Sequence, residues 1–63
     1  MTEKKEITLY LDDEEAWVLA QLVKRITWSD IRRCAVDDTE AHVMVDAIAV
    51  VRENLADAGI APR

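Results

Sequence analysis

The sequence has few of the residues that small domains use for covalent links, metal sites or phosphate loops. It has one cysteine, Cys34, so no disulfide can form within the chain, and one histidine, His42, which argues against a zinc site. The single glycine, Gly59, excludes a glycine-rich phosphate loop. With one histidine and with Ser29 at a predicted helix start, we expect no Ser/His/Asp triad. We therefore expect no metal, no cofactor and no enzyme activity.

Long apolar runs and an excess of positive charge are also missing. No run approaches the roughly 20 apolar residues that would span a bilayer, and residues 1–6 lack the apolar core of a signal peptide. We therefore expect a soluble protein of the cytoplasm, where a lone thiol stays reduced, with no membrane contact. The net charge is −5, unlike that of most proteins held to DNA by phosphate contacts. The basic stretch 24–33 lies between acidic segments.

The 63 residues are 51% hydrophobic, which predicts a single small folded domain over 1–63. A chain of this size buries only about 60% of the surface that its unfolded state exposes. Domains this small add disulfides, a metal or oligomerisation. Because the sequence argues against the first two, we expect a homodimer.

Apolar and other residues alternate with a period of two only in 6–11. A strand here would place on one face Ile7, Leu9 and Leu11. Nothing later in the chain alternates in this way, so the strand would need to pair with a second copy. We therefore expect an α+β, mostly helical fold with the order β-α-α-α and the strand paired across the homodimer.

Start and stop signals predict three helices, over about 13–26, 28–36 and 38–58. The first follows a run of acids that suits a helix N-terminus. Thr27, followed by Asp30 three residues later, makes a variant capping box, and Asp37 with Glu40 repeats the pattern. Gly59 fits the left-handed position that ends a helix.

Helical spacing predicts the buried side chains. Those of the first helix are Ala16, Leu19, Ala20, Leu22, Val23 and Ile26. Those of the second are Ile31, Cys34 and Ala35. The seam of the third is Ala41, Met44, Ile48, Val51 and Leu55, and the residues that widen it are Val43, Val45, Ala47 and Val50. An apolar face this wide indicates wrapping by both other helices or packing against a second copy.

Residues outside these faces are candidates for binding a partner protein. The predicted set is Trp17, Gln21, Lys24, Trp28, Arg32 and Arg33. Tryptophan is enriched in interfaces, although Trp17 on a polar face is equally explained if another part of the chain covers it. Whether Trp28 belongs to the core or the surface stays open at this point.

The order of elements over 5–36 resembles the ribbon-helix-helix family of DNA-binding dimers. The resemblance implies a strand pair whose outward side chains enter the major groove, with the second helix meeting phosphate near Thr27 or Ser29. Candidate nucleic-acid contacts are then Lys4, Lys5, Thr8, Tyr10, Arg32 and Arg33. Glu6, which stands where that family has a basic residue, counts against DNA as the ligand, and so does the long third helix.

A second resemblance rests on Trp28-Ser29-Asp30-Ile31-Arg32, Ala35-Val36-Asp37, Glu40-Ala41, Met44 and Gly59-Ile60-Ala61-Pro62-Arg63. These residues are similar to an uncharacterised family of short bacterial proteins often encoded near phage or mobile-element genes. That family has no known activity to carry over. It implies a mobile-element accessory protein, and small acidic proteins of that origin include anti-CRISPR and anti-restriction inhibitors.

Three functions therefore stay open from the sequence. The first is a non-catalytic interaction module that acts as a homodimer and binds another protein, with a phage-type inhibitor of host defence as its sharpest form. The second is a ribbon-helix-helix-like DNA-binding regulator. The third is a structural subunit of a larger assembly.

Overall fold

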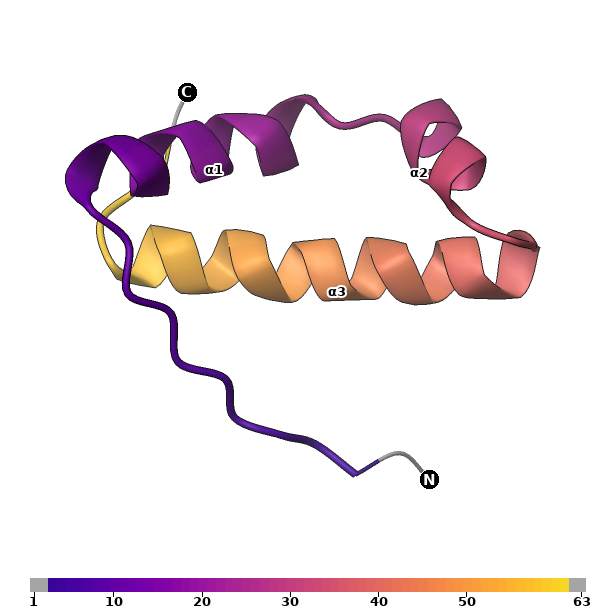
Figure 1. Cartoon of the computed structure of the whole chain (residues 1–63), viewed down its shortest axis with the longest axis horizontal. Coiled ribbons are helices and arrows are strands. Elements are labelled where there is room, and N and C mark those ends of the chain that lie inside the picture. Colours follow the sequence, from indigo (N-terminus) through magenta and orange to yellow (C-terminus); the bar gives the residue numbers. More distant parts are fainter. Residues whose placement is uncertain (1–2, 62–63) are drawn as a thin grey trace.

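The computed structural model describes residues 3–61, and in that range it contains three helices. They are α1 (Asp13–Arg25), α2 (Trp28–Cys34) and α3 (Asp38–Asp57). α1 runs antiparallel to the C-terminal half of α3, and α2 lies over its N-terminal half (Figure 1). The shortest extent is 16 Å, little more than the 10–12 Å diameter of one helix with its side chains. Both broad faces of the helical layer are therefore open to solvent.

The expected β-α-α-α fold is wrong, because the part of the chain that the structure describes contains no strand. Residues 3–11, which include the expected dimer strand of Ile7, Leu9 and Leu11, are neither helix nor strand and lead away from the helices (Figure 1). A strand forms only where a neighbouring strand satisfies its N–H and C=O groups. The alternating pattern of residues 6–11 specifies which side chains would share a face of a strand, but it does not supply the neighbouring strand. Ile7 is accordingly 79% exposed.

Each helix begins at a capping side chain. Asp12 accepts a hydrogen bond from the Glu15 backbone N–H at 2.7 Å, and the Glu15 carboxylate accepts one from the Asp12 N–H at 3.0 Å. Thr27 caps α2 with the same reciprocal arrangement, and Asp37 caps α3 by accepting one backbone N–H. These bonds satisfy N–H groups that have no partner inside a helix. The predicted helix starts are therefore those of the structure.

The end of α3 confirms the predicted glycine cap. Gly59 has φ +86°, a conformation that costs glycine little. The Ile60 N–H donates to the Leu55 carbonyl at 2.8 Å, and the Gly59 N–H donates to the Ala56 carbonyl at 2.9 Å. This is the Schellman pattern that satisfies the last carbonyls of a helix.

The core is made of a few, mostly small side chains. The buried hydrophobic residues are Ala16, Ala20, Val23, Ile31 and Ala41. The rest of the predicted α3 seam is half-buried. Other expectations of burial are wrong. Leu22 is 57% exposed, and Cys34, the last residue of α2, is also exposed. The four residues predicted to widen the α3 seam are exposed as well: Val43, Val45, Ala47 and Val50. Only the side of α1 that faces α3 is buried, and this side is narrower than the apolar stripe of α1. Leu22 belongs to the stripe but lies outside the buried side.

Arg52 joins α3 to α1. Its Nη2 donates to the Val23 carbonyl oxygen at 2.5 Å, across 29 residues of sequence. That carbonyl belongs to the last turn of α1, where C=O groups lack partners inside the helix and carry partial negative charge. A guanidinium at this point stabilises the end of α1 and holds it on α3.

Candidate interaction surfaces

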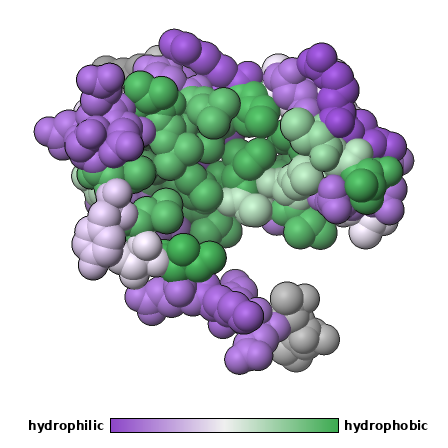
Figure 2. All heavy atoms as spheres, viewed as in Figure 1, coloured by the Kyte–Doolittle hydropathy of each residue, from purple (hydrophilic) through white to green (hydrophobic). Residues whose placement is uncertain are grey.

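Several large apolar side chains of the three helices are exposed to solvent. The exposed ones on α1 and α3 are Trp17, Val18, Leu22, Val43, Val45 and Val50. Figure 2 shows an apolar area that extends over both helices on one broad face, with hydrophilic residues around its ends. Because the helical layer is one helix thick, the described residues supply no further layer to cover it. Contiguous exposed patches of this kind mark binding surfaces.

One part of this surface is a stripe along α3, formed by Val43, Ala47 and Val50 and called here the α3 stripe. Spacings of four and three residues place these side chains on one side of the helix. All three are exposed, and the stripe carries no charged residue. Asn54 continues it by one turn, and its amide donates to the Val50 carbonyl at 2.8 Å. An uncharged apolar band of this kind resembles the core of a protein–protein interface.

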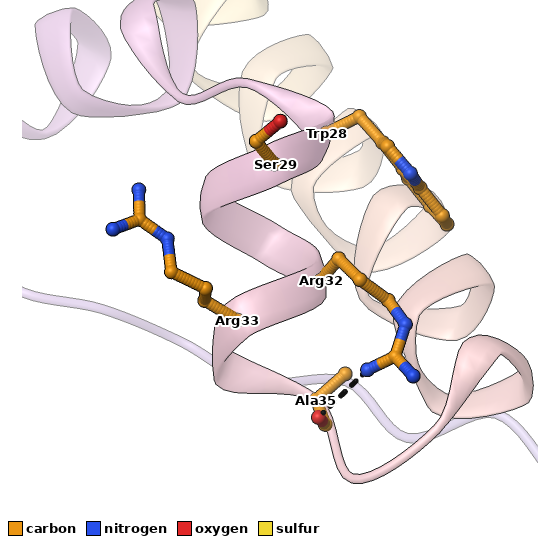
Figure 3. Close-up of a pocket in the computed structure, with 5 residues that line it drawn as sticks. All are labelled: Trp28, Ser29, Arg32, Arg33 and Ala35. Atoms are coloured by element: carbon orange, nitrogen blue, oxygen red, sulfur yellow. Dashed lines mark hydrogen bonds between the residues drawn. The ribbon is translucent and has the colours of Figure 1, made fainter.

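The predicted partner residues of α2 point in different directions. In Figure 3, Trp28 and Arg32 lie on one side of the helix, whereas Arg33 lies on the other. The Trp28 ring packs on the His42 ring of α3, with 5.1 Å between the ring centroids and a tilt of 38°. Trp28 is still 46% exposed. Trp28 therefore packs α2 against α3 while part of its surface stays exposed to solvent.

Both α2 arginines are already paired with acids of the same chain. Arg32 Nε donates to Asp38 Oδ1 at 2.6 Å, and its Nη1 donates to the Ala35 carbonyl at 3.2 Å (Figure 3 shows the second bond). Arg33 Nη2 lies 2.8 Å from Asp30 Oδ1. The carboxylates of Asp38 and Asp30 offset part of the positive charge of Arg32 and Arg33, which reduces the local potential that would attract a phosphate.

Asp30 is held in its charged form. Hydrogen bonds from the Thr27 backbone N–H and the Thr27 hydroxyl lower the pKa of its carboxyl group, and the positive charge of Arg33 adds to the effect. The same carboxylate therefore caps α2 and neutralises Arg33. Its role is accounted for by the fold.

The other predicted partner residues lie apart from α2. Trp17, Gln21 and Lys24 are on α1, where Trp17 and Lys24 are exposed and Gln21 is half-buried. α1 and α2 each pack on α3 and do not contact each other. The six predicted partner residues therefore form two groups rather than one site.

The candidate DNA contacts are divided as well. Lys4, Lys5, Thr8 and Tyr10 are exposed in the non-helical segment 3–11, which leaves the helices on the side of α3 away from α2 (Figure 1). The arginines are on α2. DNA binding stays a prediction. The described residues contain no strand that would bring these candidate contacts together.

Sequence reasoning missed the exposure of Val18 and Leu22. Val18 was assigned to neither face of α1, and Leu22 was assigned to the core. The available signal was the short length of the chain, because the three helices found within 3–61 include no element that covers a second side of α1.

Within 3–61, no group of three or more His, Cys, Asp or Glu residues is placed to hold a metal ion. None of the three helices combines the length and the apolar character that crossing a membrane requires.

The whole chain, residues 1–63, matches the family model described as a family of unknown function (DUF7706), and the chain belongs to that family. Comparison with curated proteins and with solved structures finds no match. Membership agrees with the resemblance to an uncharacterised family and brings no activity with it.

Proposed function

We propose that this protein is a non-catalytic interaction module that binds another protein chain through the exposed apolar side chains of α1 and α3. The observation that carries the proposal is the distribution of apolar residues. Three of the five buried hydrophobic residues are alanines, whereas Leu22, Val43 and Val50 are exposed. Covering a side chain of this size contributes about 1.5–3 kcal/mol. A partner that packs on this face supplies the layer that the described chain lacks.

The narrower form of the proposal is an accessory protein of a phage or mobile element that occupies a basic surface of a host defence protein. Two observations support it: the net charge of −5 and the resemblance to short mobile-element proteins. Opposite charges around an apolar contact speed association and select the partner.

A ribbon-helix-helix regulator is not proposed. The described residues contain no ribbon, and the α2 arginines are paired with Asp30 and Asp38. Duplex DNA enters the experiment below as a competing ligand.

The test compares two lysine substitutions on α3. Val50→Lys places a charge in the α3 stripe, whereas Glu53→Lys makes a larger charge change at an exposed position outside it. Tagged wild-type protein is used to capture partners from the cells that encode it, and each captured protein is purified and titrated with both variants. We expect Val50→Lys to weaken binding at least about tenfold, because an interface core excludes charge, and Glu53→Lys to bind nearly as wild type.

Three results would contradict the proposal. One is equal binding of a different captured protein by both variants, and another is the absence of any bound protein, including a second copy in sedimentation. The third is tight binding of duplex DNA that weakens steeply with salt, as phosphate contacts require.

A further inference from the structure

The outer side of α1 carries four exposed residues in a regular order. They are called here the α1 stripe and are Glu15, Val18, Leu22 and Arg25. Successive members are three, four and three residues apart, which places all four within an arc of about 80° on a helix of 3.6 residues per turn. The buried residues Ala16, Ala20 and Val23 face away from this stripe, toward α3.

The stripe is complementary to its own reverse. From N- to C-terminus the stripe runs acid, apolar, apolar, base. When a second copy runs in the opposite direction, its base faces the acid of the first copy, and the two apolar positions stay in the centre. In a two-fold symmetric pair of antiparallel helices, residue i faces j and j faces i. Val18 then faces Leu22 of the second copy, and Glu15 faces Arg25. Both pairs are symmetric about position 20, so one axis satisfies all four contacts.

The side chains of the stripe are available for such contacts. Val18 is 61% exposed. Arg25 makes no hydrogen bond or ion pair with any residue that the structure describes. Glu15 uses Oε1 in the capping box with Asp12, which leaves Oε2 for a second donor. A parallel arrangement in register would instead place the acidic first turns of two α1 helices together, and like charges repel.

We infer that two copies of this chain associate through α1, with their α1 helices antiparallel and the α1 stripes in contact. The inference rests on the proposed function, because it names a second copy as the partner of Val18 and Leu22. Two helices of 13 residues form a contact smaller than the roughly 800 Å² per partner of a typical stable complex. We therefore expect the dimer to be weak and reversible, so that its formation depends on protein concentration.

The decisive experiment exchanges the charges. Glu15→Arg alone gives two bases that face each other across the axis, and Arg25→Glu alone gives two acids. Each single variant dimerises at least about tenfold more weakly than wild type in sedimentation equilibrium. An equimolar mixture restores both opposite-charge pairs, so it forms a heterodimer of near wild-type affinity. Far-UV circular dichroism of each variant checks that α1 is still folded, since Glu15 also contributes to its cap.

A neutral pair of variants covers the case in which a charged variant fails to fold. Val18→Ser removes apolar contact from the stripe without touching the cap, and Val36→Ser makes the same change at an exposed residue between α2 and α3. Val18→Ser weakens the dimer at least about tenfold, because the symmetric interface loses the contact twice. Val36→Ser leaves the dimer unchanged.

The outcomes separate this inference from the proposed function. Loss of the dimer in the single variants and its return in the mixture support the inference. A wild-type dimer that all these variants leave intact overturns the α1 arrangement, while the proposed function stands. A monomeric wild type that captures another protein through α1 also overturns the inference, and a monomer that binds no protein overturns both.

Discussion

Removing the Arg52 guanidinium tests how much of the fold depends on the link between α3 and α1. Arg52→Met keeps most of the aliphatic stem and leaves the Val23 carbonyl without its charged donor. Hydrogen bonds with charged groups contribute about 1.5–3 kcal/mol, and we take the lower end because the Arg52 residue is exposed. A domain of this size has a free energy of unfolding of only about 3–9 kcal/mol. We therefore expect a loss of about 1.5 kcal/mol and a fall in Tm of about 6–12 °C.

The assay is urea and thermal unfolding followed by far-UV circular dichroism, at one protein concentration throughout. Arg33→Met is the matched control, because it removes a guanidinium from a pair whose side chains are 78% and 44% exposed, and such surface pairs contribute little. Equal losses in the two variants, or no loss in Arg52→Met, would refute the role given to this bond.

Three smaller predictions concern helix ends. Thr27→Ala removes the α2 cap and lowers the free energy of unfolding by about 1 kcal/mol in urea, whereas Thr27→Ser keeps it. We expect NMR titration to give the Asp30 carboxyl a pKa below its ordinary value of 3.8. The stability that the charged carboxylate contributes is present above pH 3.8 and is lost as the pH falls through the lowered pKa. Titration of Asp30 at 3.8 would disprove the lowered pKa. Gly59→Ala costs about 1 kcal/mol through the positive φ alone, because no atom lies within 4 Å of the added carbon; an unchanged melting curve would contradict the cap.

The helix starts were predictable because they depend on a few adjacent residues. A capping bond joins residues three apart, such as Thr27 and Asp30, so its partners can be read directly from the chain. The helix C-termini are different. α1 ends at Arg25, α2 at Cys34 and α3 at Asp57, ahead of the predicted 26, 36 and 58, because the last turn depends on local backbone geometry that composition does not specify.

The strand was not predictable because its stability depends on a partner. The alternation of Ile7, Leu9 and Leu11 with polar residues is a property of 6–11 alone. The hydrogen bonds of a strand belong to a pair, and the described chain holds no second strand. The pattern was therefore compatible with a strand without being sufficient for one.

The wrong prediction that Leu22 is buried and the exposed apolar surface of α1 have the same physical cause. The apolar residues of α1 cover a wider arc than α3 alone can bury, so α1 turns its smallest residues, Ala16 and Ala20, toward α3 for a close approach. The larger Val18 and Leu22 are then left facing solvent. A hydrophobic pattern specifies that these side chains prefer burial, and it does not specify whether the burying surface belongs to the same molecule. Leu22, for which the sequence predicted the wrong environment, is therefore one of the residues that the structure offers to a second chain.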